Sequence, residues 1–374
     1  MINLNKLVEI GFTLPQATDI SAHLANVGYL AKITSDDLAD GFVIPENKHF
    51  VISDVSGLNS ALKSDTKFYQ DINAVLTQKG NAKPNQGRVN EIHVYVYDNE
   101  NDATIEDGFD AFFALNADWS QLLIDSDVTA DIVAIAGKVE ATGRMFIAQP
   151  SDAVTVAETL AGLGYANTKI VKHISSESLQ GALVGVLANG NLGSVGDLYS
   201  EFKGITPQEY TATEMSGMDA ANVAYYSTVN AINGGGVEQY GRSILYGNKQ
   251  VNGEITKRRY IRYTLDLLLK AKVLDFLAKK LTYQESSNNI LEGMLKEVLI
   301  GSQSNDLIVE DTEDTNGFYI KCMPIAEVKK YYPADYSNQV YHANGWYIDA
   351  LTGTKVIIDL AVNPSDAEKT AIEL

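Results

Sequence analysis

The feature that most constrains the fold is a repeated alternation of strand-like and helical segments between residues 49 and 179. Such alternation favours an α/β layer with a partly parallel sheet, since parallel strands need crossover connections that are usually helical. Side chains able to cap a helix support two boundaries, with Ser126 or Asp127 before one helix and Ser151 or Asp152 before the next. The expected strands are 49–54, 91–97, 121–124, 144–148 and 169–174, and the expected helices are 64–78, 105–115, 130–140 and 153–162.

Both ends of the chain have the pattern of a strand with one apolar face. Apolar side chains fall on alternate positions in the first twelve residues, with Lys6 as the exception, and again within 354–362. Chain ends are usually polar and frayed, so these patterns indicate strands that need a sheet to join. The alternating residues are Ile2, Leu4, Val8, Ile10 and Phe12 at the amino end, and Val356, Ile358, Leu360 and Val362 at the carboxyl end.

Beyond residue 190 the composition changes, with clustered glycines and short β-like pieces such as 222–228. The longest helix candidate, 258–281, would span roughly 36 Å. Apolar residues occupy nearly its whole circumference, so we expect it to be buried. A second helix, 289–300, should end at Gly301. Two hairpins are expected after it, pairing 307–311 with 318–322 and 345–349 with 354–362.

Positive charge is concentrated on the long helix. Residues 257–280 include eight basic residues and two acidic ones, in a chain whose formal net charge is −19. Two interpretations remain open: the cations sit at the ends of a buried helix, or they face an acidic partner surface. The candidates for such a surface are Lys257, Arg258, Arg259, Arg262, Lys279 and Lys280.

Composition argues against several classes of protein. An acidic surface repels a phosphate backbone, which disfavours nucleic-acid binding. The single cysteine, Cys322, excludes an internal disulfide and a four-thiolate metal site. No signal-peptide pattern and no run of about 18 apolar residues occurs, so we expect no membrane partner. The five histidines show no pair at metal-ligand spacing, and we expect neither a metal nor a cofactor.

One segment imitates a phosphate-binding loop. Residues Gly236 to Ser243 differ from that pattern in having Arg242 where the lysine belongs, and a β-like segment follows instead of a helix. Acidic stretches at 98–102 and 311–317 resemble calcium loops but lack the required register. With no nucleophile elbow either, we expect no catalytic residues and no enzyme activity.

Residues 130–270 resemble the sheath proteins of contractile phage tails and related injection particles. The matching pieces occur in the family's order and spacing, although 195–198 and 257–260 depart from its pattern, so no side-chain role is carried onto those positions. The pieces are Ala130-Asp131-Ile132, Val139-Glu140-Ala141-Thr142-Gly143-Arg144, Phe146-Ile147-Ala148-Gln149, Ser151-Asp152-Ala153, Gly162-Leu163-Gly164-Tyr165, Lys169-Ile170-Val171-Lys172-His173, Gly193-Ser194, Phe202-Lys203-Gly204-Ile205-Thr206-Pro207, Asn222-Val223-Ala224-Tyr225-Tyr226 and Gly253-Glu254-Ile255.

The resemblance implies a structural subunit that polymerises as a helical sleeve around an inner tube. Terminal arms would add strands to sheets of neighbouring subunits, and contraction would drive the tube through a target envelope. The implied partners are copies of the same chain, the tube protein, and the baseplate and tail terminator proteins. The implied location is the contractile tail of a virion or equivalent particle, assembled in the bacterial cytoplasm.

The expected fold class is therefore mixed α/β and α+β, with mixed sheets flanked by helices and extended terminal β-arms for strand exchange. We expect an amino-terminal arm (1–30), an α/β domain (31–200), a polymerising core with two long helices (201–337) and a carboxyl-terminal hairpin or arm (338–374). Two alternatives remain: an α/β enzyme that binds a phosphorylated ligand at Gly236–Ser243, and another self-assembling component such as a tail tube.

Overall fold

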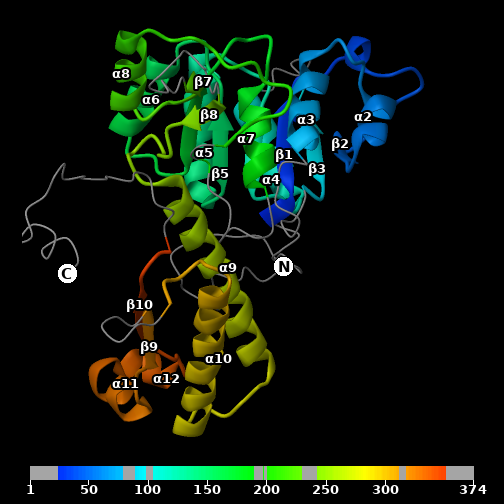
Figure 1. Cartoon of the computed structure of the whole chain (residues 1–374). Coiled ribbons are helices and arrows are strands. Elements are labelled where there is room, and N and C mark those ends of the chain that lie inside the picture. Colours follow the sequence, from blue (N-terminus) through cyan, green and yellow to red (C-terminus); the bar gives the residue numbers. More distant parts are fainter. Residues whose placement is uncertain are drawn as a thin grey trace, which may run out of the picture.

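The computed structural model describes residues 24–78, 89–97, 104–188, 197, 200–229, 242–310 and 317–350. Figure 1 shows a body built on a large sheet and, below it, a group of helices with a two-stranded ribbon. The alternating residues of both expected terminal arms lie outside the described residues, as do 236–241 of the glycine-rich loop.

The body is built on an eight-stranded mixed sheet with the order β2-β3-β1-β4-β5-β6-β7-β8. The six central strands, from β3 to β7, are parallel, and each edge strand is antiparallel to its neighbour. This sheet confirms the expected mixed α/β class. Its strands are β1 (Val27–Ala31), β2 (His49–Ile52), β3 (Ile92–Val96), β4 (Gln121–Ile124), β5 (Met145–Ala148), β6 (Thr168–Lys172), β7 (Ala224–Val229) and β8 (Arg242–Tyr246).

Strand β1 lies near the middle of the sheet, between β3 and β4. Every residue of β1 is buried, because helices cover both faces of the sheet. Gly28 is required there, since a Cβ atom at this position would lie 2.8 Å from the Trp119 ring. The predicted domain boundaries at residues 30 and 200 both fall within the part of the sequence that forms this one sheet. Residue 30 belongs to β1, and the last strand of the sheet, β8, ends at Tyr246.

Helices pack on both faces and enclose two apolar cores. One core contains side chains of α2 (Val55–Ala61), α3 (Lys67–Thr77) and α7 (Leu179–Leu187). The other contains side chains of α4, α5, α6 and α8, and Figure 1 shows the helices arranged about the sheet. These four helices are Ile105–Ala114, Thr129–Thr142, Ala153–Gly162 and Ala212–Ala220, and a short 3-10 helix, η2, spans Ser35–Asp37.

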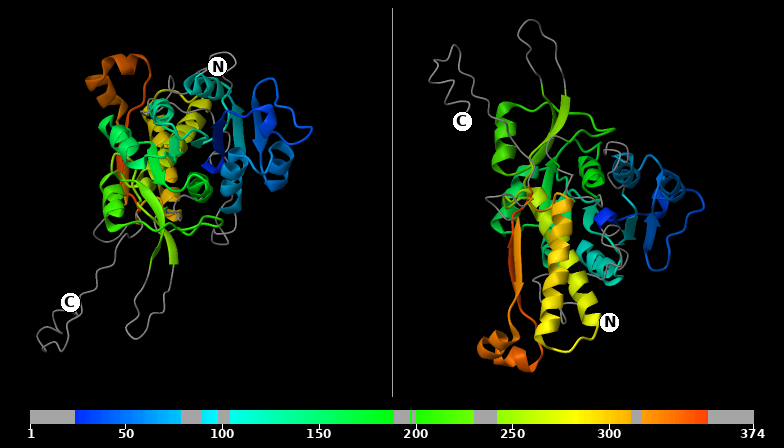
Figure 2. Two further views of the ribbon diagram at one scale, coloured as in Figure 1. Left: turned by 90° about the horizontal axis from the view of Figure 1, so that it is seen from above. Right: turned by 60° about the horizontal axis from the view of Figure 1, so that its bottom comes forward.

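Helix α9 (Thr256–Ala278) connects the body to the lower group. Its first half belongs to the core shared with α3 and α7, through Tyr260, Ile261 and Leu265. Its second half packs on α10 (Glu285–Ser304), as both views of Figure 2 show. The remaining elements are β9 (Phe318–Cys322), α11 (Ile325–Tyr331), α12 (Pro333–Ser337) and β10 (Ala343–Tyr347).

Several local expectations are confirmed. All five expected strands between residues 49 and 174 are present, and so are the four helices, with boundaries shifted by up to three residues. Asp152 caps α6 by accepting a bond from the Thr155 amide, whereas α5 begins after Val128, which provides no side-chain cap. Helix α10 continues past Gly301 to Ser304. None of the described helices is long and apolar enough to cross a membrane.

The first expected hairpin is wrong. Strand β9 pairs with β10, in the register Tyr319 with Trp346, and not with 307–311. Residues 307–309 instead pair with 348–350, the segment directly after β10: Val309 donates to the Ile348 carbonyl and Ala350 donates to the Leu307 carbonyl. Residues 307–309 and β9 therefore lie end to end beside one continuous segment, 343–350. The intervening helices α11 and α12 form the excursion that separates the two paired strands in sequence. The second expected hairpin involves 354–362, outside the described residues.

Candidate functional site

The basic candidates fall into two groups at opposite ends of α9, about 33 Å apart for a helix of this length. At the first turns, Arg258 Nε lies 2.6 Å from Asp349 Oδ2, and Arg262 Nη2 lies 3.1 Å from Glu254 Oε1. Arg259 is buried and donates through Nε to Asn167, and burial lowers its pKa. Lys257 is half-buried, and burial lowers its pKa also. These arginines therefore have partners within the subunit.

At the other end, Lys279 and Lys280 are exposed. Lys279 Nζ lies 3.4 Å from Met294 Sδ, a weak partner, and Lys280 has a positive φ of 50° in the turn after the helix. Between the two groups, Lys270 is buried and pairs with Asp266 at 2.9 Å. Among the six candidates, Lys279 and Lys280 at the far end of the helix are thus the two that are exposed and have no carboxylate partner within the described residues.

A buried lysine fastens the start of α9 to the sheet, and the sequence alone did not indicate it. Lys169 on β6 is completely buried and lies 2.8 Å from Asp197 Oδ2. Its three protons have three acceptors: the Gly247 and Lys249 carbonyls and Thr256 Oγ1, at 3.0–3.1 Å. A buried ammonium is tolerated only with such complete pairing. The group joins β6, the segment after β8, and the first residue of α9.

A second anchor lies one turn along the helix. Tyr260 Oη donates a hydrogen bond of 2.7 Å to Oε1 of Gln121, which is the first residue of β4. Burial raises the pKa of Tyr260 well above its usual value, so the phenol stays protonated and remains a donor. With the Lys169 group, this bond fixes the direction in which α9 leaves the body.

Another buried cation stabilises the body itself. Arg144 follows Gly143, whose positive φ of 73° ends α5, and its guanidinium stacks 3.7 Å above the Trp119 ring. Burial lowers the pKa of Arg144 to about 10. Stacking on an aromatic face compensates part of the cost of removing this charge from water. We assign Arg144 a structural role in the core.

The ribbon of β9 and β10 is the most open β-structure among the described residues. No further strand pairs with it there, so β10 keeps an edge without a strand partner. Four of the five β10 residues are exposed. The rings of Tyr319 and Trp346 stack on one another and are each about half exposed. Such an edge offers unpaired backbone donors and acceptors to another strand.

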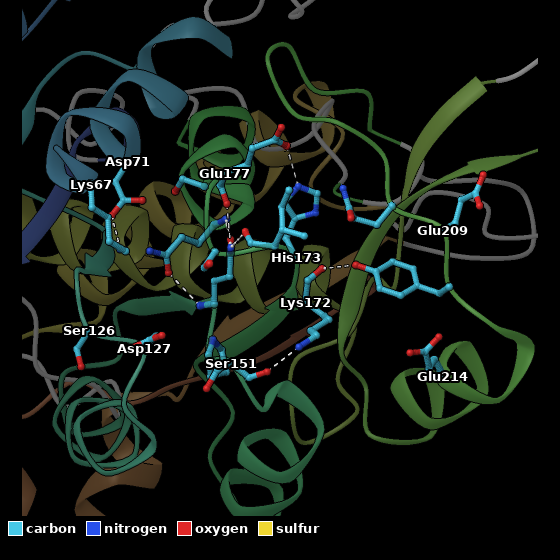
Figure 3. A pocket seen from close by; sticks show the side chains of 18 residues that line it. Lys67, Asp71, Ser126, Asp127, Ser151, Lys172, His173, Glu177, Glu209 and Glu214 are labelled. Atoms are coloured by element: carbon cyan, nitrogen blue, oxygen red, sulfur yellow. Dashed lines mark hydrogen bonds and ion pairs between the residues drawn. The ribbon is translucent and has the colours of Figure 1, made fainter. Parts of the chain in front are cut away.

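A cavity of about 390 Å³ opens where the parallel strands β4, β5 and β6 end (Figure 3). Ligands of open α/β sheets commonly bind at this edge, so its chemistry matters. His173 Nε2 lies 2.9 Å from Glu177 Oε2, and Thr206 donates to both oxygens of the same carboxylate. Gln149 and Gln180 exchange backbone-to-side-chain bonds across the same wall.

Two titratable groups of this cavity, His173 and Glu177, hold each other. Burial lowers the pKa of His173, against the opposing effect of Glu177. Burial would raise the pKa of Glu177, but hydrogen bonds from His173 and Thr206 outweigh it and lower that pKa. Together these contacts fasten the segment around Thr206 onto the carboxyl edge of the sheet. We therefore interpret the network as a structural brace of the body.

His49, His93 and Cys322 also have structural surroundings. His93 is buried in the sheet and its Nδ1 lies 3.1 Å from His49 Nε2. Burial raises the pKa of the Cys322 thiol to about 11, which keeps it unreactive at neutral pH. In the described ranges, no three His, Cys, Asp or Glu side chains form a group that could hold a metal ion.

No protein-family model and no curated protein matches the sequence. Solved structures do. A chain in the cryo-EM structure of the anti-feeding prophage (AFP) baseplate, six-fold symmetrised, is 8% identical with a TM-score of 0.66, covering 96% of this chain and 98% of that one. A chain in the cryo-EM structure of the AFP helical sheath in its contracted state is 10% identical with a TM-score of 0.64, covering 96% and 99%.

This chain has the fold of those particle subunits. The resemblance to contractile sheath proteins inferred from residues 130–270 is thereby confirmed at the level of the fold. The agreement extends over nearly the whole length of both chains, well beyond the residues that carried the sequence resemblance. At 8–10% identity this likeness concerns the fold alone.

Proposed function

We propose that this protein is the structural subunit of a contractile sheath, which polymerises as a helical sleeve around an inner tube. The observation that carries the proposal is the near-complete, two-way coverage of a subunit from a contracted sheath, with no large segment left over on either side. An enzyme built on the same sheet would be expected to add catalytic loops, whereas the side chains at the carboxyl edge brace one another.

Strand donation by the chain ends is the proposed link between subunits. The alternating apolar residues at 2–12 and 356–362 have the sequence pattern of strands with one apolar face, and within the described residues one edge of β10 has no strand partner. We propose that this ribbon receives an arm from a neighbouring subunit. An added strand with about five backbone hydrogen bonds, each contributing about 1 kcal/mol net, would give a joint of about 5 kcal/mol before apolar burial is counted.

Contact with the inner tube is proposed for the exposed far end of α9. Lys279 and Lys280 have no carboxylate partner within hydrogen-bonding distance in the described part of the chain and face solvent. Exposed cations attract an acidic partner surface in a salt-dependent way. Arg258, Arg259 and Arg262 already contact Asp349, Asn167 and Glu254, so their contribution to a tube interface would require those contacts to exchange.

For contraction we propose a shear-type change in which rigid subunits re-dock while the arms keep them connected. The anchors of α9 support rigidity, because Lys169 and Tyr260 tie the helix to two different strands of the sheet. The proposed partners are further copies of the chain, the tube, and the baseplate and terminator proteins. The proposed location is the tail of a contractile particle assembled in the bacterial cytoplasm, with no role for nucleic acid, membrane, metal or cofactor.

A position at the baseplate is the second candidate, because one of the matching chains comes from a baseplate structure. The phosphate-binding enzyme is disfavoured, since strand β8 begins at Arg242, where a phosphate loop requires a helix amino terminus. A tail-tube role is disfavoured by the same whole-chain likeness to a sheath subunit.

Electron microscopy of the purified protein, with and without the co-expressed tube protein, tests the proposal. Long ribbed hollow sleeves are the expected result. Single rings that never elongate would favour the baseplate position. A monodisperse small particle that binds nucleotide in calorimetry would overturn the sheath assignment in favour of the enzyme.

A further inference from the structure

The last described residues of the chain, just before the carboxyl-terminal arm sequence, are held from two sides. Residues 348–350 continue the ribbon by pairing with 307–309, through bonds of 3.0 Å from Val309 to Ile348 and 3.1 Å from Ala350 to Leu307. Asp349 forms an isolated bridge with Ile308. We call residues 347–350 the arm root. The alternating residues of the arm begin at Val356, six residues beyond its end.

The other side of the arm root is held by the first turns of α9. Arg258 donates through Nε to Asp349 Oδ2 at 2.6 Å, and the Asp349 side chain is only 15% exposed. One turn further, Arg262 Nη2 lies 3.1 Å from Glu254 Oε1. Arg258 therefore reaches from α9 to the arm root, and its contact is charge-assisted.

This part of α9 is itself fixed to the sheet. Thr256 accepts from the buried Lys169, and Tyr260 donates to Gln121 on β4. The position of the arm root relative to the sheet is thus fixed by α9, because this helix is anchored to the sheet and cannot rotate freely. Six residues would span about 20 Å if fully extended, so a small change of direction at the root would shift the start of the proposed arm strand by several ångströms. Strand pairing tolerates little displacement, because a slip of one residue inverts the buried face.

We propose that Arg258 is a positioning residue for the carboxyl-terminal arm: it holds the arm root and sets the direction in which the arm leaves the subunit. The inference rests on the proposed strand donation and changes the expected role of one of the basic candidates. Arg258 acts within the subunit, through Asp349, and the tube contact falls to other residues.

A charge swap tests the proposal. Arg258→Asp and Asp349→Arg each break the pair, whereas the double variant Arg258→Asp with Asp349→Arg rebuilds it in reverse. Since 1.4 kcal/mol corresponds to a factor of ten and a charged hydrogen bond contributes about that much, each single variant should raise the critical concentration for sleeve formation about tenfold. The double variant should return to within about threefold of wild type. Lys203→Glu, which reverses an exposed charge of the body outside both the arm root and the proposed tube contact, is the matched control and should leave assembly unchanged.

Hydrogen exchange on the unassembled subunit provides the second readout. Amides of 309 and 350 should exchange faster in Arg258→Asp and regain protection in the double variant, while the melting temperature stays near that of wild type. Unchanged exchange in Arg258→Asp, or sleeve formation equal to wild type in both single variants, would overturn the proposal. If the wild-type protein forms no sleeves, the proposed function fails, whereas the exchange measurement still decides whether Arg258 holds the arm root.

Discussion

Removing the ammonium of Lys169 should destabilise the whole subunit, because it leaves Asp197 as an uncompensated buried charge. Lys169 is fully buried, lies 2.8 Å from Asp197 Oδ2, and supplies donors to two carbonyls and to Thr256 Oγ1. Breaking a buried pair by deleting one partner costs about 3–5 kcal/mol. For a chain whose stability is of the order of 5–15 kcal/mol, Lys169→Met should therefore shift urea unfolding strongly.

The assay is urea unfolding followed by circular dichroism, with Lys172→Met as the matched control. Lys172 lies on the same strand but donates to the Ser151 carbonyl at the surface, so its loss should cost less than about 1 kcal/mol. Adding Asp197→Asn to Lys169→Met should recover part of the stability, since no unpaired charge then remains. A Lys169→Met variant within 1 kcal/mol of wild type would refute the anchoring role assigned to this lysine.

Three further predictions concern pH and assembly. Burial raises the pKa of Asp125 to about 6, so folding favours its protonated form and stability is lost as pH rises from about 4 to 6. Asp125→Asn should therefore raise the melting temperature at pH 7 and not at pH 4. Equal effects at the two pH values would contradict this. Deleting residues 1–12, or introducing Ile358→Asp, should abolish sleeves while the circular dichroism of the subunit is unchanged; sleeves of normal length from either variant would exclude that arm. Lys279→Glu with Lys280→Glu should weaken tube co-sedimentation at 50 mM salt more than at 500 mM, and binding indifferent to both changes would rule out a tube contact there.

The parallel part of the sheet could be predicted from the sequence, because β4 and β5 are short apolar runs, β6 has an apolar centre, and helical patterns separate them, with Asp152 as a recognisable cap of α6. Strand β1 was missed because five buried residues near an arm-like terminus show no alternation. Helix α7 was missed for a related reason: seven of its nine residues are buried, so no polar face reveals the helical period.

Long-range pairing was the part that local pattern could not supply. In the sequence, the segments 307–311 and 345–349 lie on either side of the strand 318–322, and either could pair with it. In the fold it pairs with β10, which α11 and α12 bring beside it. The basic residues of α9 show the same limit. Their number and spacing were visible in the sequence, but the partners Asp349, Asn167 and Glu254 come from three distant or folded-back segments.

The burial of the long helix was predicted only in part. The apolar residues around its circumference are buried at Ile261, Leu265 and Leu267, where α9 enters the core of the body. Toward its end, Phe276 packs against Tyr341 and against side chains of α10, whereas Leu277 is 36% exposed.

A cryo-EM reconstruction of sleeves assembled from the full-length chain tests the central claim most directly. The account predicts that residues 2–12 or 356–362 of one subunit form a strand beside β10 of another, in register with alternate apolar side chains against the ribbon. Density in which both chain ends fold back into their own subunit, with β10 still unpaired in the assembled particle, would contradict it.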